Sequence, residues 1–425
     1  MAIEQGMGRR AFVRIGAAGV ATLVCGRLFA PRGALADTPA GGAAAAKACI
    51  VLWLNGGPSH IDTFDPKPGT KAGGPFKAIK TSAPGVMIGE HLPQFAAEAH
   101  RLAILRGMSS KEGSHQRAQY LLHTGYAPNP TVDHPALGGY VSQQLGDPAA
   151  ELPAFVSLGG PSAGGGFLGV QHGPLIVQTP GAMPRDVGLA VNVDEARFGR
   201  REAALAILEE ELAARTGDPK VHGRRAVHDK AVRMMRSPRL AAFDVSSEPE
   251  QVRKAYGDTA FGRGCLTARR LIEAGVRYVE VVLDGWDTHR DGFERTKRLM
   301  GALDPAVATL LRELEARKLL DATLVACLGE FGRTPRINGD EGRDHHPQAW
   351  SAVLAGGGIR GGVVHGKTDA EGGKVVEGAT SVADLFATIA ARIGLDPTKT
   401  FDTPLGRPIS LTEDGTPIAA VMKTG

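Results

Sequence analysis

The sequence has few cysteines, and no two of them stand at the spacing of a zinc site. Four are present, and Cys25 belongs to an N-terminal segment that we interpret below as a signal. The other three, Cys49, Cys265 and Cys327, allow at most one disulfide within a chain, which excludes a small disulfide-stapled architecture. Cys49 and Cys327 stand in apolar runs, as buried structural thiols usually do.

Long apolar segments are also missing after the N-terminal region. None approaches the roughly 20 residues that span a bilayer, so we expect no membrane span. Aromatic residues make up only 5% of the chain, whereas 57 glycines and 27 prolines predict many loops and tight turns. The 425 residues suffice for one large α/β domain or two smaller ones.

The N-terminus has the order of an export signal. Arg9 and Arg10 precede Phe12 and a modestly apolar run, and the sequence Ala-Leu-Ala ends at Ala36. This order is typical of a twin-arginine signal over residues 1–36, cleaved after Ala36. A basic N-terminal helix is the alternative interpretation.

The mature chain lacks a net charge. Residues 1–36 contain five arginines and one glutamate, so their removal reduces 49 basic and 45 acidic residues to 44 of each. A neutral chain gives no electrostatic reason for binding nucleic acid or an anionic membrane. We therefore expect a periplasmic or secreted protein that begins at Asp37, with a linker of small residues over 37–48.

Beyond the linker, short apolar runs alternate with amphipathic segments. A continuous apolar run such as 49–55 is typical of a strand buried on both faces of a parallel sheet. The pattern predicts a doubly wound, mostly parallel α/β sheet with helices on both faces, which fills residues 49–425 as one domain. Expected strands are 49–55, 101–108, 153–160, the first part of 276–289, 323–328 and 351–357; expected helices are 114–125, 291–317, 381–394 and an inserted helical segment over 196–274.

Ionisable side chains follow several of these strands directly. Asp62 lies in the loop after the first strand, Asp287 and His289 follow the strand of 276–289, and Glu330 ends the strand of 323–328. Ligand and catalytic sites of parallel α/β sheets form in the loops at the carboxyl ends of the strands. We therefore expect these side chains to converge.

The segment Gly-Arg-Asp-His-His that ends at His346 adds further candidates. Carboxylates and imidazoles are ligands for zinc, manganese, iron, magnesium or calcium. We interpret this segment as a ligand-bearing loop in which Asp344 and His345 bind a divalent metal and Arg343 or His346 faces a substrate anion. His365 follows as one more candidate ligand. A solvated loop without metal is the alternative.

Several long motifs resemble a known family. They are "LWLNGGPSHIDTFDPKPG", "GWDTH", "LVACLGEFGRTPRIN", "GRDHHPQAWSAVLAGGGIRGG" and "GRPI". They are similar to domain-of-unknown-function family 1501, which comprises exported bacterial proteins placed in the alkaline phosphatase and sulfatase superfamily. The resemblance covers nearly all of residues 49–425 and implies an alkaline phosphatase-like fold, but it supplies no reaction.

The wider superfamily also implies roles for individual residues. The segment "SHQRAQYLLHTGYAP" resembles the superfamily's nucleophile helix, which places His115 at the nucleophile position with Ser114 beside it. Phe331 stands where the superfamily has a histidine, and the cysteine signature of sulfatases is absent, which argues against a sulfatase. The metal ligands implied by this comparison are Asp62, Asp287, His289, Glu330, Asp344, His345 and His365.

Together these features predict a metal-dependent hydrolase of phosphate or related esters. The metal would bind the ester oxygens and activate Ser114 or water, and Arg333 or Arg343 would hold the anion by paired hydrogen bonds. The expected substrate is a small anionic ester or a polysaccharide-derived ester. The alternative is a binding protein that kept the fold and lost turnover, and a bound metal fits both.

Overall fold

The structure, a computed structural model, describes residues 45–424. The predicted export signal and most of the predicted linker lie outside the described residues, so both stay predictions. In the described part, no helix is long and apolar enough to cross a membrane.

The strands are short and distributed along the whole described chain. They are β1 (Ala48–Asn55), β2 (Ala78–Lys80), β3 (Met87–Gly89), β4 (Leu102–Met108), β5 (Phe155–Leu158), β6 (Leu175–Val177), β7 (Tyr278–Asp284), β8 (Thr323–Leu328), β9 (Gly332–Ile337), β10 (Arg343–His346), β11 (Trp350–Gly356), β12 (Val363–His365), β13 (Lys367–Thr368), β14 (Val375–Glu377), β15 (Thr400–Asp402) and β16 (Pro408–Ser410).

Helices fill much of the remaining sequence, with short 3₁₀ turns between them. They are α1 (Pro93–Ala97), α2 (His115–Thr124), α3 (Leu137–Gln144), α4 (Glu195–Thr216), α5 (Pro219–Met235), α6 (Glu250–Ala255), α7 (Ala260–Glu273), α8 (Gly292–Ala316) and α9 (Val382–Arg392).

One sheet of eight strands organises the fold, in the order β12-β4-β11-β8-β1-β7-β5-β6. Five of its seven strand pairs are parallel, and the two antiparallel pairs are those that β11 makes with β4 and β8. The first strand in sequence, β1, lies in the middle. The predicted class, a mostly parallel α/β sheet, is therefore confirmed.

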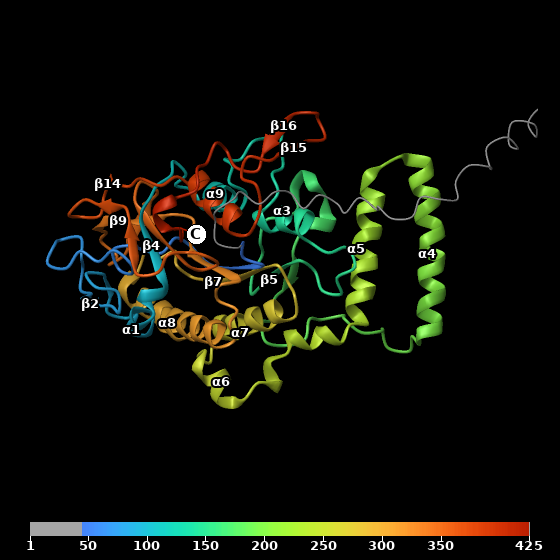
Figure 1. The fold of residues 1–425 in the computed structure, drawn as a ribbon, viewed down its shortest axis with the longest axis horizontal. Coiled ribbons are helices and arrows are strands. Elements are labelled where there is room, and N and C mark those ends of the chain that lie inside the picture. The colour runs from blue at the N-terminus through green and yellow to red at the C-terminus, as the bar shows by residue number, and fades with distance from the viewer. Residues whose placement is uncertain (1–44, 425) are drawn as a thin grey trace, which may run out of the picture. The chain divides into compact units, whose positions relative to one another are not determined.

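Helices cover both faces of this sheet, as predicted. Figure 1 shows α7 and α8 along one side of the sheet and α3 and α9 on the other. On β1, Ile50 and Leu52 pack into the core shared with α7 and α8, while Val51 and Trp53 pack into the core shared with α3 and α9. Each fully buried aliphatic side chain of this kind contributes about 1.5–3 kcal/mol. This two-sided burial explains why β1 is a continuous apolar run.

The segment 195–273 contains two kinds of helix. None of the residues of α4 is buried, and α4 packs mainly against α5. By contrast, α7 is buried along most of its length and packs on β7 and α8. The helices of this segment therefore range from an exposed pair to a full member of the core.

The charged segment between β8 and β11 folds as a hairpin. Its strands β9 and β10 pair in antiparallel fashion, with His345 opposite Arg333. The sequence predicts a loop at 343–346, and the structure differs because backbone hydrogen bonds, which do not depend on apolar side chains, hold β10 to β9. Since β11 runs antiparallel to β8, the hairpin begins and ends at the same edge of the sheet.

The three cysteines of the described chain are buried and free. Cys49 and Cys327 stand on β1 and β8, where their thiols act as small apolar side chains.

Candidate functional site

The carboxyl ends of β1, β7 and β8 lie side by side and place three polar segments together. Asn55 at the end of β1 is level with Asp284 at the end of β7, and Trp53 is level with Leu328 at the end of β8. The segments that follow these strands carry Gly56, Asp287 and Glu330. This is the edge at which the sequence predicted a site.

Gly56 is where two of these segments meet. Its φ of +113° and its close approach to the backbone of Asp287, where an added Cβ would lie 2.3 Å from the amide nitrogen, leave no room for a side chain. Its N–H donates to both carboxylate oxygens of Glu330, at 3.0 and 3.1 Å. Glu330 is fully buried, so these bonds fix its orientation.

Arg333 ties the hairpin to the other segments. Its buried guanidinium donates to the carbonyls of Gly56, Gly57 and Arg343, and to Oδ1 of Asp287 at 2.6 Å. Partial burial alone would raise the pKa of Asp287, but the hydrogen bond and charge of Arg333 lower it to about 2. Asp287 therefore stays a carboxylate at any physiological pH.

The first turn of α2 brings His115 to this carboxylate. Nδ1 of His115 lies 2.7 Å from Oε1 of Glu330, and Nε2 lies 3.3 Å from Oδ1 of Asp287. The hydrogen bond to Glu330 raises the pKa of His115 above its usual value. Although Nε2 is buried, it makes no hydrogen bond with any described residue.

Two further histidines approach Asp287 from the hairpin and from the segment after β7. Nε2 of His345 lies 3.3 Å from Oδ1 of Asp287, and Nε2 of His289 lies 3.1 Å from the same oxygen. Nδ1 of His345 faces the carbonyl of Gly113 at 2.8 Å, and Nδ1 of His289 faces Oδ1 of Asp344 at 3.0 Å. Burial lowers the pKa of His345.

Each of these three rings has an oxygen acceptor at both of its nitrogens, and a neutral ring can donate to only one of them. In the tautomer with the proton on Nδ1, the rings of His115, His289 and His345 donate to Glu330, Asp344 and the carbonyl of Gly113. All three Nε2 lone pairs then point at Oδ1 of Asp287, and Nε2 of His289 lies only 3.0 Å from Nε2 of His345. Acceptors facing one another repel unless a proton or a cation lies between them.

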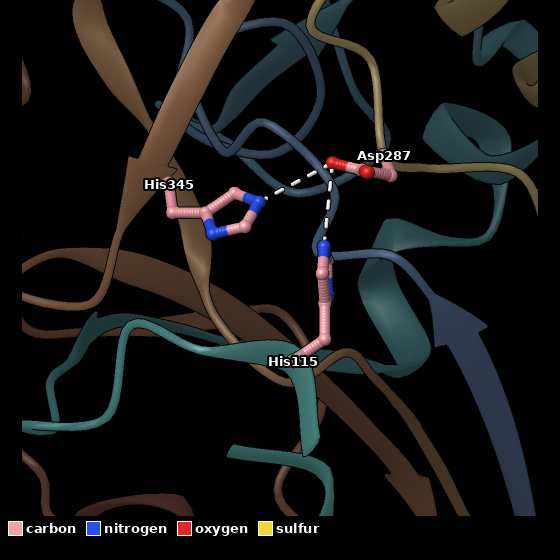
Figure 2. Close-up of side chains that lie close together, drawn as sticks. All are labelled: His115, Asp287 and His345. Atoms are coloured by element: carbon pink, nitrogen blue, oxygen red, sulfur yellow. Dashed lines mark hydrogen bonds and ion pairs between the residues drawn. The ribbon is translucent and has the colours of Figure 1, made fainter. Parts of the chain in front are cut away.

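The geometry fits a metal ion. One ligand atom each from His115, Asp287 and His345 lie within 4.8 Å of one another, and Figure 2 shows both imidazoles turned toward the same carboxylate oxygen. Three imidazole nitrogens and one carboxylate oxygen, if His289 is included, form a donor set typical of zinc or manganese. Ligating histidines usually donate their second nitrogen to a carboxylate or carbonyl, and each Nδ1 here has such an oxygen at 2.7–3.0 Å.

The charges of the site point the same way. Three carboxylates, of Asp287, Glu330 and Asp344, stand against the one guanidinium of Arg333 in this cluster, which leaves two negative charges when the histidines are neutral. A divalent cation would neutralise the remaining charge.

The sequence profile described as "Protein of unknown function (DUF1501)" matches residues 46–422. The chain belongs to the DUF1501 family. The resemblance drawn from the motifs is thereby confirmed at the level of the family. No curated protein matches the chain.

Solved structures to which this DUF1501 protein is similar have very different sequences. One is the lipoteichoic acid synthase LtaP from Listeria monocytogenes, with 8% identity, a TM-score of 0.40, and 88% of this chain and 76% of that chain covered. Another is the phosphonate monoester hydrolase of Agrobacterium radiobacter, with 13% identity, a TM-score of 0.38, and 88% and 78% covered. A third is a protein in the alkaline phosphatase superfamily from Vibrio parahaemolyticus, with 11% identity, a TM-score of 0.35, and 83% and 67% covered. Similarities at such low identities and TM-scores do not indicate the activity of this protein.

Other predicted site residues of the DUF1501 chain lie apart from the three histidines. Asp62 and Arg343 form a buried two-bond ion pair with each other, at 2.8 and 3.0 Å, and Arg343 also donates to the carbonyls of Ala72, Thr334 and Pro335. Arg343 is buried, so its charge is used inside the protein.

Among the described residues, the side chains of Ser114 and His365 make no hydrogen bond or ion pair with the cluster. Ser114 is exposed at the N-cap of α2 and makes no side-chain capping bond. His365 ends the edge strand β12, and no hydrogen bond or ion pair between described residues joins it to the cluster. His346, next to His345, hydrogen-bonds the carbonyl of Gly373 at 2.8 Å instead.

Two contributors to the site were not predicted from the sequence. Gln119 donates to Oδ1 of Asn55 at 2.8 Å and to Oε1 of Glu330 at 3.3 Å, and the carbonyl of Gly113 holds His345. A signal was present for Gln119, since it stands four residues after His115 and therefore on the same face of α2. No sequence signal marks a backbone carbonyl.

Proposed function

We propose that this protein is a metal-dependent hydrolase of phosphate esters or related anionic esters. The observation that carries the proposal is the convergence of three oriented Nε2 atoms on Oδ1 of Asp287. A purely structural cluster would need no such alignment of lone pairs.

Within this proposal, His115, His289, His345 and Asp287 hold one divalent ion. Each has a partner that sets its orientation: Glu330 for His115, Asp344 for His289, Gly113 for His345 and Arg333 for Asp287. Asp344 is therefore assigned to orientation of a ligand, although the sequence analysis expected it to bind metal directly. Asp62, His365 and Arg343 have no part in this ion site.

A divalent ion held there supplies Lewis acidity toward an ester oxygen and lowers the pKa of water. The chain's own residues contribute orientation and charge. Glu330 and Arg333 are both buried, so the ligands that they hold keep their geometry without substrate. Ser114 precedes His115 at the start of α2, and its free hydroxyl is the candidate nucleophile, with water as the alternative.

A second candidate function is ligand binding without turnover. It is favoured because both arginines that were predicted to bind the substrate anion bind other groups of the protein. Arg333 donates four hydrogen bonds, and Arg343 forms an ion pair with Asp62. A hydrolase of anionic esters usually offers a free cation to the substrate.

Metal content and turnover together separate these functions. The chain from residue 37 onward is loaded with zinc or manganese, dialysed and analysed for metals by mass spectrometry, then assayed on aryl phosphate, phosphodiester and sulfate esters with and without a chelator. About one ion per chain and chelator-sensitive turnover support the hydrolase. One ion without turnover on any ester supports the binding protein, and no ion in the wild type overturns the metal-dependent hydrolase.

Matched variants localise the ion. His345→Ala and Asp287→Asn should lose the ion, whereas His365→Ala should retain it, because His365 lies apart from the cluster. Retention of a full complement by His345→Ala would overturn the assignment of the ion to this cluster.

We also propose that the protein is exported through the twin-arginine pathway and acts in the periplasm or outside the cell. The order of the arginine pair, apolar run and Ala-Leu-Ala sequence supports this proposal.

A further inference from the structure

The helix α4 presents an exposed face with an unusual distribution of charge. Its inner face contacts α5, where Arg236 forms an ion pair with Glu202 at 3.6 Å and lies over the ring of Phe198. Figure 1 shows α4 beside α5, outside the sheet and the helices that cover it. We define the outer face of α4 as eight exposed residues: Arg200, Arg201, Ala203, Ala204, Ile207, Leu208, Glu210 and Glu211.

The middle of the outer face is apolar. Ile207 is 61% exposed and Leu208 is 63% exposed, and Ala203 and Ala204 lie one turn before them. Two adjacent, largely exposed aliphatic side chains leave apolar surface in contact with water, and a partner that covers this surface gains hydrophobic stabilisation.

The two ends of the outer face carry opposite charges. Arg200 and Arg201 lie toward the N-terminus of α4, and Glu210 and Glu211 lie toward its C-terminus. No ion pair between described residues involves any of these four, although α4 forms others with α5. Charges that the rest of the described chain leaves unpaired are available to another molecule.

This pattern is complementary to itself. If a second copy of α4 lies antiparallel across a two-fold axis between Leu205 and Ala206, Arg200 faces Glu211 of the partner subunit, because positions 200 and 211 are about three turns apart and lie on the same side of the helix. The same axis places the small side chain of Ala204 opposite the large side chain of the partner subunit's Ile207. An isologous contact of this kind satisfies both charge and volume with one surface.

We propose that the protein forms a homodimer through the outer face of α4. The contact is an antiparallel helix pair with an apolar centre and Arg–Glu pairs at both ends. Since one 22-residue helix is about 33 Å long, the contact falls at the small end of specific interfaces, and we expect a dissociation constant on the order of 10 µM.

Charge reversal tests the proposal without touching the candidate site. In sedimentation velocity from about 1 to 200 µM, the wild-type chain from residue 37 should show a monomer–dimer equilibrium that weakens about tenfold or more from 50 to 500 mM salt. Arg200→Glu/Arg201→Glu and Glu210→Arg/Glu211→Arg should each raise the dissociation constant by about tenfold or more. Both should keep the wild-type circular dichroism and melting temperature, since all four side chains are exposed.

Mixing the two variants provides the decisive measurement. An acidic helix and a basic helix restore every Arg–Glu pair in an antiparallel heterodimer, so the mixture should dimerise about as tightly as the wild type. Leu208→Asp should weaken both the homodimer and this heterodimer. A wild type that stays monomeric to 200 µM, or a dimer that neither reversal weakens, would overturn the proposal, and so would a mixture that stays monomeric.

Discussion

Glu330 and His115 are joined by a hydrogen bond of 2.7 Å between Oε1 and Nδ1, although 215 positions separate them in sequence. The same carboxylate accepts two bonds from the backbone N–H of Gly56. His115 is thereby oriented by the backbone at the end of β1, the central strand of the sheet, and its Nε2 is kept directed at Asp287.

Replacement of Glu330 by Gln should therefore weaken metal binding. The amide of Gln can flip and point its N–H at Nδ1 of His115, which favours the tautomer with the proton on Nε2, the nitrogen that would bind the metal. Loss of a hydrogen-bond partner of a metal-ligating histidine typically lowers the metal affinity about 10–100-fold. A competition titration with a chelating dye measures the change. Glu341→Gln, an exposed carboxylate in the turn of the same hairpin, should bind as tightly as the wild type. Equal affinity in both variants would show that Glu330 does not orient a ligand.

Replacement of Arg333 by Met should destabilise the fold. It removes a buried cation and leaves the carbonyls of Gly56 and Gly57 and the carboxylate of Asp287 without their donor. The two carbonyls are buried, and each buried acceptor left without a donor costs about 1–3 kcal/mol, a loss that chemical denaturation can measure. Arg336→Met, an exposed arginine three positions along the hairpin, should change the free energy of unfolding by less than about 0.5 kcal/mol. Comparable losses in the two variants would contradict this account.

Stability should also depend on pH through His123, which is buried against Trp53. Its Nε2 lies 3.3 Å from Oε1 of Glu280, and its Nδ1 lies 2.7 Å from the carbonyl of Gln119. Burial lowers the pKa of His123, but the charge of Glu280, the hydrogen bonds to Glu280 and to the carbonyl of Gln119, and the charge of Glu330 together outweigh it, so the pKa is raised in the folded state. A raised pKa stabilises the fold fully below the unfolded value of about 6.5, and this contribution is lost as pH rises through the folded value.

The measurement compares the wild type with His123→Gln in urea between about pH 5.5 and pH 9. The wild type should be the more stable of the two by an amount that shrinks as the pH rises. The exposed His222→Gln serves as the control and should show a small difference at every pH. If the difference in free energy of unfolding between the wild type and His123→Gln were constant over this range, the ion pair of His123 with Glu280 would not be its cause.

Export should depend on the arginine pair. Arg9→Lys/Arg10→Lys should leave uncleaved precursor in the cytoplasm, whereas Arg14→Lys should be exported and processed to a chain that begins at Asp37. Fractionation and N-terminal sequencing measure both. Normal processing of the double variant would mean that residues 1–36 are not a twin-arginine signal.

Much of the fold could be predicted because buried strands have a strong sequence signal. The runs at β1 and β8 are apolar on both faces, and the residues of α8 that repeat at helical spacing, including Leu303 and Val307, are buried. The direction of β11 could not be predicted, since an apolar run reads the same in either direction. Similarly, β10 has no apolar alternation, and its pairing with β9 comes from the backbone.

The candidate site was predictable only in part. Asp287 and His289 follow the end of β7, and His345 lies in the hairpin that follows β8, so topology alone brings these residues together. The pairing of Arg343 with Asp62 was not predictable, because it joins side chains 281 positions apart through loops whose paths depend on the whole fold. The position of His115 followed from a family resemblance and not from periodicity.

The place of β1 in the sheet has a consequence for how the chain folds during synthesis. Both of its neighbours, β7 and β8, come from the second half of the sequence, and Asn55 meets Asp284 only after 229 further positions. At about 5–20 residues per second, a ribosome needs roughly 10–45 s to make that stretch. For that time the apolar run of β1 has neither of its strand partners, so the nascent chain carries an unpaired apolar strand, the kind of segment that is prone to aggregation, until β7 and β8 have been made.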